Sequence, residues 1–107
     1  MTDRLEKEVG MIERNLDILT RVNEHEPIGI VKLSNYSGYE HHEVRYSLRV
    51  LEEDGLIEPS PQGAMTTERT DEFVSELDDR LATLAERLDA MELDNPTESK
   101  LATRREI

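Results

Sequence analysis

The stretch that decides the fold runs over residues 38–57 and reads GYEHHEVRYSLRVLEEDGLI. Its apolar residues Val44, Leu48 and Leu51 recur at helical spacing, so they predict one buried face of a helix. Gly55 follows at the place where a glycine commonly ends a helix. The next two residues, Leu-Ile, begin a short apolar segment of the kind that forms a strand. The stretch therefore predicts a helix that leads through a glycine into a strand.

Two further helices are expected before this one. Residues 3–25 carry an apolar stripe in steps of four and three, and Pro27 closes that helix. A segment of about two turns follows from Gly29 to Tyr36, and Ser37-Gly38 makes the turn into a third helix over 40–54. The stripe of the first helix consists of Leu5, Val9, Met11, Ile12, Leu16, Ile18, Leu19 and Val22.

Two short strands are expected after the third helix, over 56–60 and 64–67. The residues between them read Ser60-Pro61-Gln62-Gly63, with proline second and glycine fourth, as a type I turn prefers. The two strands therefore predict a β-hairpin.

A last helix is expected from about Thr70 to Leu93, and its apolar residues fall at strict heptad positions. These positions are Val74, Leu77, Leu81, Leu84, Leu88 and Met91. Three consecutive heptad pairs favour a coiled-coil seam between two subunits. The alternative is one amphipathic helix packed on its own domain, but about 20 helical residues reach about 30 Å, longer than one face of so small a domain. The flanking charges, with Arg80 and Arg87 before the first seam position and Asp78 and Glu92 after the second, favour parallel pairing.

The middle of the chain resembles the winged helix-turn-helix regulators of the MarR, ArsR and PadR-like families. In those families a small residue opens a tight turn, a helix follows, and the helix ends in an L-E-x-x-G-L-I phrase, here residues 51–57. The resemblance implies a mainly α fold with a small β-hairpin wing and a long C-terminal dimerisation helix. With the heptad pattern and the polar composition of the last residues, it gives a winged helix-turn-helix domain over 1–68, a dimerisation helix over 69–94, and a polar tail over 95–107 that we expect to be disordered. The resemblance implies that the protein binds double-stranded DNA as a homodimer and regulates transcription.

The third helix offers a candidate DNA-binding stripe on the side opposite its apolar residues. His42, Arg45, Tyr46 and Arg49 are spaced i, i+3, i+4 and i+7 and share that side. Arginine suits base edges in the major groove, especially guanine, and also phosphates. An ordinary solvated face is the alternative interpretation. In the resembling families, residues at these positions enter the major groove. The remaining candidates are His41, Lys32 and Gln62.

Some features oppose DNA binding. Glu40 stands at the start of the third helix, where these families usually have serine or threonine, and Glu43 adds a second charge that repels phosphate. The predicted hairpin has no arginine or lysine over 58–65, which opposes its contact with the minor groove. A winged helix that binds another protein instead of DNA is therefore the alternative function.

The net charge of −12 also opposes DNA binding, because an acidic surface repels phosphates, but the acidic residues are unevenly distributed along the chain. Residues 1–27 carry a net −3 and residues 51–107 a net −10, whereas residues 28–50 carry three bases and two acids, a net +1. Acid excess with only three lysines against ten arginines resembles the proteins of salt-loving archaea. Salt near 1 M screens charge within about 3 Å, so acidity would not forbid DNA binding there. An acidic protein that binds other proteins is the alternative.

Composition narrows the other function classes. The chain has no cysteine, which excludes disulfides, thiolate metal sites and cysteine nucleophiles. It lacks an apolar run of membrane-spanning length and a signal peptide, so we expect a cytoplasmic protein without membrane contact. His41 and His42 diverge by about 100° on a helix, and His25 would have to approach from another helix, so we expect no metal. No phosphate loop or nucleophile motif is present, so we expect neither an enzyme nor a cofactor. The sequence does not identify a small-molecule effector.

Overall fold

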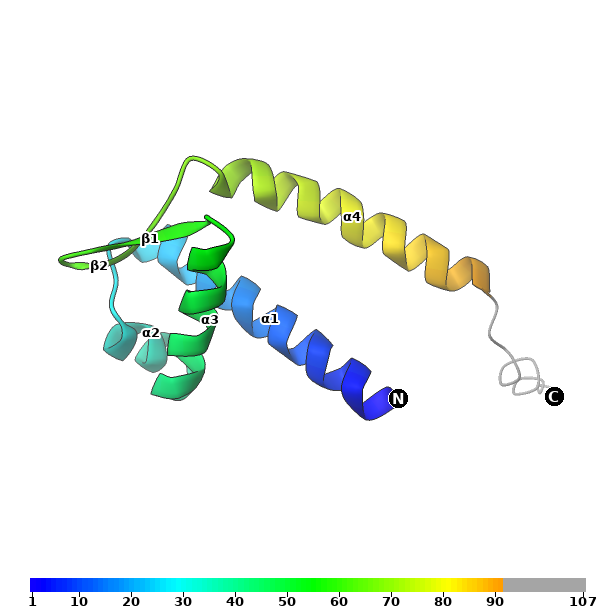
Figure 1. Ribbon diagram of the computed structural model, residues 1–107, viewed down its shortest axis with the longest axis horizontal. Helices are drawn as coiled ribbons and strands as arrows, with labels where there is room; N and C mark the ends of the chain where they lie inside the picture. The colour runs from blue at the N-terminus through cyan, green and yellow to red at the C-terminus, as the bar shows by residue number, and fades with distance from the viewer. Residues whose placement is uncertain (92–107) are drawn as a thin grey trace. The chain divides into compact units, whose positions relative to one another are not determined.

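The computed structural model describes residues 1–91, and these form four helices and a two-stranded antiparallel sheet (Figure 1). The chain divides into two compact units, Met1–Phe73 and the residues from Val74 onward. A helix-rich fold with one β-hairpin is thus confirmed, whereas the tail expected over 95–107 lies outside the described residues. The elements are α1 (Thr2–His25), α2 (Ile30–Ser37), α3 (His41–Glu53), β1 (Ile57–Ser60), β2 (Gly63–Thr66) and α4 (Thr70–Met91).

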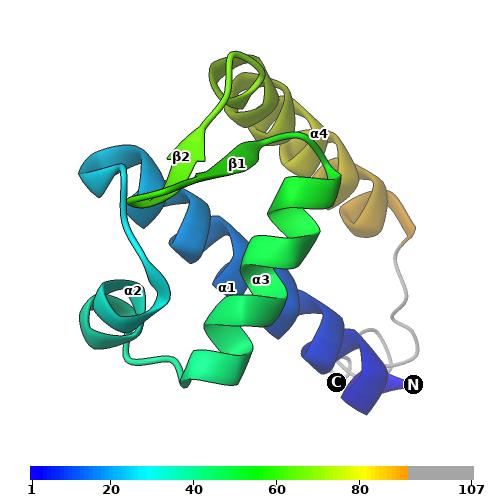
Figure 2. The same ribbon diagram turned by 60° about the vertical axis from the view of Figure 1, so that its left-hand side comes forward.

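The core of the first unit lies where α3 crosses α1, with the hairpin at the C-terminal end of α3 (Figure 2). Val44 and Leu51 are buried as predicted, while Leu48 is half-buried at the edge. Sequence periodicity did not indicate Ser47, which is fully buried between them. The buried apolar residues are Ile18, Leu19, Val22, Ile28, Leu33, Val44, Leu51, Leu56, Ile57 and Ala64.

The apolar stripe of α1 has two different environments along its length. Ile18, Leu19 and Val22 are buried against the rest of the first unit. Every residue of the N-terminal half, up to Glu13, is exposed, and Leu5 retains 57% of its accessible surface. The periodicity therefore predicted the helix correctly, but only its C-terminal half contributes to the core.

The hairpin is joined to the segment between α1 and α2. Its strands pair from Ile57 with Thr66 to Ser60 with Gly63, within one residue of the predicted bounds. Ile28 forms an isolated bridge with Ala64 on the other side of β2, through N–H···O bonds of 3.1 and 2.8 Å. This approach explains Gly63, because a Cβ there would lie 2.4 Å from the Ile28 carbonyl carbon.

Gly55 ends α3, as the sequence predicted, and it adopts a left-handed conformation with φ of +76°. Its N–H donates to the Glu52 carbonyl at 3.0 Å, and the N–H of Leu56 donates to the Leu51 carbonyl at 2.9 Å. These two bonds form a Schellman motif, which satisfies the last carbonyl groups of the helix. The buried Leu56 then leads into β1.

Two threonines organise the start of α4. Thr67 accepts the Arg69 N–H at 3.2 Å and donates its hydroxyl to the Gly55 carbonyl at 2.6 Å. Thr70, which is buried, donates to the Leu56 carbonyl at 2.7 Å. The first turn of α4 therefore packs within the first unit, which extends to Phe73. No helix within residues 1–91 has both the length and the apolar character needed to cross a membrane.

Candidate nucleic-acid interface

The turn between α2 and α3 is fixed by hydrogen bonds from short polar side chains. Gly38 ends α2 with φ of +84°, and its N–H donates to the Ser34 carbonyl at 2.8 Å. The Ser34 hydroxyl donates to the Tyr39 carbonyl at 2.6 Å, and the Ser37 hydroxyl donates to the Leu33 carbonyl at the same distance. The direction in which α3 leaves α2 is thus set by local bonds.

Two glutamates occupy the N-terminal end of α3. The Glu43 carboxylate accepts the backbone N–H of Glu40 at 3.0 Å, so this residue satisfies a donor at the helix start. Glu40 lies 3.4 Å from Nδ1 of His42, measured from its Oε1. These two carboxylates repel DNA phosphates, but they also stabilise the start of α3, because negative charge is favourable at the N-terminus of a helix.

The exposed face of α3 presents His42, Arg45 and Arg49, as the sequence predicted. Within residues 1–91, neither arginine takes part in an ion pair. Glu53 follows Arg49 by four residues and so lies on the same side of the helix. The cationic part of this face is therefore its central portion, around Arg45 and Arg49, because the N-terminal end carries Glu40 and Glu43 and the C-terminal end carries Glu53.

Tyr46 differs from the other members of the predicted stripe, because it lies beside α1. The guanidinium carbon of Arg14 lies 5.7 Å from the centre of the Tyr46 ring. Nε of Arg14 donates to the Ser47 hydroxyl at 2.8 Å, and Arg14 also lies 3.8 Å from the Glu43 carboxylate. This arginine side chain is only 15% exposed. Arg14 thus connects α1 to α3 and holds one edge of the candidate interface.

The Arg14 contact was missed by sequence reasoning. Arg14 and Ser47 are 33 residues apart, and no local pattern connects them. A weak signal was available, since Ser47 lies three residues after Val44 and so on the same face as the predicted core.

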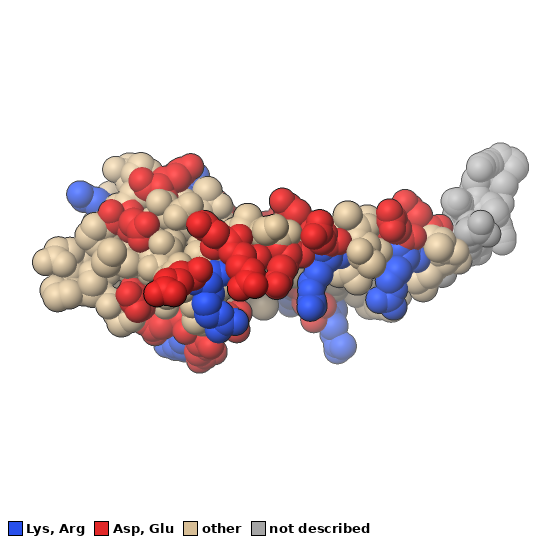
Figure 3. All heavy atoms as spheres, turned by 90° about the horizontal axis from the view of Figure 1, so that it is seen from above, with Lys and Arg blue, Asp and Glu red and all other residues tan. Residues whose placement is uncertain are grey.

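Of the remaining candidate residues, His41 is exposed at the start of α3, whereas Lys32 and Gln62 are exposed but lie outside α3. Lys32 is on α2, and Gln62 is at the tip of the hairpin. The hairpin residues, 57–66, carry Glu58 and no basic side chain. Figure 3 agrees, since the surface around the hairpin, at the left, is mostly free of charged side chains on the face in view.

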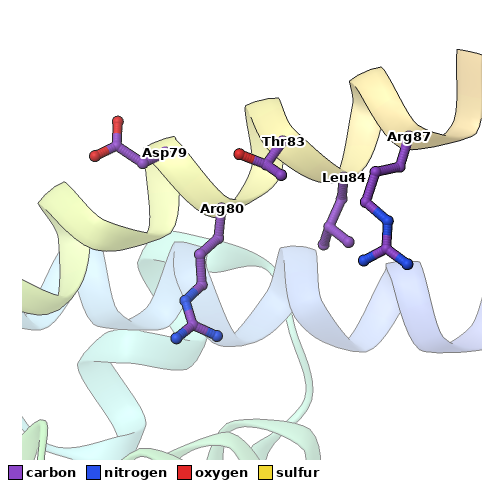
Figure 4. A pocket seen from close by; sticks show the side chains of 5 residues that line it. All are labelled: Asp79, Arg80, Thr83, Leu84 and Arg87. Atoms are coloured by element: carbon purple, nitrogen blue, oxygen red, sulfur yellow. The ribbon is translucent and has the colours of Figure 1, made fainter. Parts of the chain in front are cut away.

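The apolar stripe predicted for α4 is present and largely uncovered. Val74, Leu81, Leu84, Leu88 and Met91 are all exposed, and Leu77 is half-buried. Arg80, Leu84 and Arg87 project to one side of α4 (Figure 4). These three residues, with Asp79 and Thr83, line a shallow depression. The two arginines therefore lie on the same side of α4 as Leu84.

The histidines do not form a metal site among the described residues. His41 and His42 are exposed on α3, whereas His25 stacks on Tyr36 with ring centroids 4.8 Å apart. No group of three or more histidine, aspartate or glutamate side chains within residues 1–91 is arranged to hold an ion.

No protein-family model matches the sequence. No curated protein matches it either. Among solved structures, the chain is similar to the activation domain of the transcription factor MotA from phage T4, at 23% sequence identity. The match covers 76% of this chain and 82% of that domain, with a TM-score of 0.53. The similarity establishes a shared fold with a domain of a transcription factor.

Proposed function

We propose that residues 1–68 form a winged helix-turn-helix that binds double-stranded DNA and regulates transcription. The order of elements supports this, because α2 and α3 form the two helices of the motif and the hairpin follows as the wing. The Ile28–Ala64 bridge supplies a third strand position beside β2. The resemblance of residues 51–57 to MarR, ArsR and PadR-like regulators agrees with this assignment.

One observation carries the proposal. Arg45 and Arg49 are exposed and form no ion pair within the described residues. Both lie within residues 28–50, the only one of the three segments with a positive net charge. Their helix is held from behind by the core and from one side by Arg14. Two unpaired guanidiniums on a fixed helix suit guanine edges and phosphates in the major groove.

We further propose that the protein acts as a homodimer through α4. The apolar stripe from Val74 to Met91 is exposed over most of its length, and a heptad seam is usually covered by a second helix. A dimer would present α3 twice, so the operator would contain two half-sites one helical turn apart, or a multiple of it.

The test begins with selection of duplexes from a random DNA pool in concentrated KCl. Fluorescence anisotropy then compares the parent with Arg45→Ala/Arg49→Ala. We expect the double variant to bind at least about 30-fold more weakly, because each base contact contributes about 1–3 kcal/mol. Arg4→Ala/Lys7→Ala removes two positive charges from α1 and serves as the matched control. Equal affinity of the parent and the α3 variant would refute the assignment of α3.

Dimerisation is tested separately by light scattering at tens of micromolar. The parent should have twice the chain mass, and Leu81→Asp/Leu88→Asp should have the mass of one chain or unfold. A parent with the mass of one chain would exclude the dimer and the operator with two half-sites. The anisotropy experiment would then test whether a monomer binds DNA.

A second function is favoured by the hairpin. Its only charge is Glu58, and a wing without arginine or lysine has little attraction for the phosphate backbone. The similar MotA domain is described as an activation domain, which agrees with a winged helix that contacts a protein of the transcription machinery. If the parent binds no DNA at any salt concentration, this second function replaces the first.

A further inference from the structure

A groove of about 280 Å³ lies between the C-terminal half of α3, the hairpin and the segment that precedes α2. Figure 2 shows where the backbones of these three parts lie in the first unit. The groove is separate from the α4 seam, and it does not include Arg45 or Arg49. Its lining residues are Ile28, Gly29, Ile30, Leu48, Glu52, Ile57, Pro59, Ser60, Gly63 and Ala64.

The floor and walls of the groove are apolar. In the lining, Ile28, Ile57 and Ala64 are buried, while Ile30 and Leu48 are half-buried. The two glycines in the lining add no side chain. A hydrocarbon group placed here would contact carbon on several sides and would leave water, which is the main source of affinity in small-molecule sites.

Glu52 is the only ionisable residue in the lining. Its side chain is exposed, and within residues 1–91 its carboxylate forms no ion pair. The other polar side chain, Ser60, is already committed, since its hydroxyl donates to the Gly63 carbonyl at 2.6 Å and accepts the Gln62 N–H at 3.3 Å. The polar group left for a ligand is therefore a carboxylate, which as an anion only accepts hydrogen bonds.

We propose that this groove binds a small lipophilic cation, such as a primary alkylammonium, with its hydrocarbon body on Ile30, Leu48 and Ala64 and its ammonium group at Glu52. An anion of the same size would be repelled by the carboxylate, and an alcohol would gain the apolar contacts without the charge pair. The volume suits a ligand of this size rather than a folded partner, which would need a larger apolar surface. The ligand would contact α3 and the hairpin together, and the site does not depend on the DNA-binding proposal.

Three probes with the same six-carbon chain separate these contributions: hexylammonium, 1-hexanol and hexanoate. Each is titrated into the ¹⁵N-labelled full chain and followed by amide chemical shifts. We expect shifts centred on Leu48, Ile57 and Ala64. Hexylammonium should bind about two- to fivefold more tightly than hexanol, the range of an exposed ion pair, and hexanoate should bind more weakly than both. Shortening the chain by one methylene should weaken binding about fourfold.

Glu52→Gln should make hexylammonium and hexanol bind equally while leaving hexanol unchanged. Glu53→Gln is the matched control, because it removes the same charge from the next residue of α3, which does not line the groove. The control should retain the preference for the cation. Shifts elsewhere in the chain, equal binding of the three probes to the parent, or an unchanged preference in Glu52→Gln would each overturn the proposal. Binding of none of the probes at millimolar concentration would overturn it as well.

Discussion

The C-terminal half of α1 and the length of α4 carry similar apolar stripes but have opposite environments. In α1, Ile18, Leu19 and Val22 are buried by α3 and the hairpin. In α4, the stripe from Val74 to Met91 is almost entirely exposed. Helical periodicity therefore predicts that a helix will form and which face is apolar, but it does not say whether that face is covered by the same chain. The first unit therefore covers the apolar stripe of one of its own helices, whereas the stripe of α4 is exposed along most of its length.

The largest expected effect comes from making the same substitution, leucine to alanine, in both helices. Leu19→Ala should cost about 2–5 kcal/mol of unfolding free energy at any protein concentration, because it leaves a cavity in the core. Leu84→Ala should cost less than about 0.5 kcal/mol in the monomer, with a cost that grows as association becomes significant. Denaturant unfolding at 1 µM and 100 µM measures both. If Leu84→Ala lowers the free energy of unfolding as much as Leu19→Ala does, and by the same amount at both protein concentrations, α4 packs on its own chain.

A second test concerns the close contact between the hairpin and the segment before α2. Gly63→Ala should destabilise the protein by about 1–3 kcal/mol, because its Cβ would meet the Ile28–Gly29 backbone and its φ is +132°. Gly10→Ala, in the exposed half of α1 with nothing within 4 Å, should instead stabilise by about 0.5–1 kcal/mol. Thermal unfolding of the two variants measures both shifts. Shifts of the same sign would contradict the contact between the hairpin and the segment before α2.

A third test addresses the polar contact between α1 and α3. Removing the Ser47 hydroxyl leaves Nε of Arg14 without its partner, so Ser47→Ala should cost about 1 kcal/mol. A double-mutant cycle with Arg14→Ala should give a coupling energy of about 0.5–1.5 kcal/mol. Ser75→Ala, at an exposed position of α4, is the control and should be close to neutral. A coupling energy near zero would show that Arg14 does not hold α3.

These tests separate what the sequence could predict from what it could not. The helices, the left-handed Gly55 and the exposure of Arg45 and Arg49 follow from local rules of spacing and backbone conformation, and all are present. Contacts between distant segments have no such signal. The Glu26 carboxylate, for example, accepts the Thr66 N–H at 2.7 Å across 40 residues. The exposed half of α1 was unpredictable for a similar reason, since the extent of burial depends on where neighbouring elements end.

The smallest expected effect concerns how two copies of α4 would pair. Arg80 and Arg87 project to the same side of α4 as Leu84 (Figure 4), and in the heptad each precedes a first seam position. In a parallel dimer, Arg87 would face Glu92 of its mate, a residue just beyond the described part of the chain. In an antiparallel dimer that matches Val74 with Met91, Arg87 would face Arg80.

The substitution Arg87→Glu therefore has opposite consequences in the two arrangements. In a parallel dimer it creates repulsion and should raise the dimer Kd by about two- to fivefold, since an exposed pair contributes about 0–1 kcal/mol. In an antiparallel dimer it replaces a repulsion with an attraction and should lower the Kd. Sedimentation equilibrium in 0.3 M and 3 M KCl measures the change, which should shrink at the higher salt concentration because exposed charges are screened there. Arg69→Glu, which lies before α4 and outside the seam, is the control. The heptad charges favour the parallel pair, so a tighter dimer of Arg87→Glu would overturn that orientation while leaving the apolar seam intact.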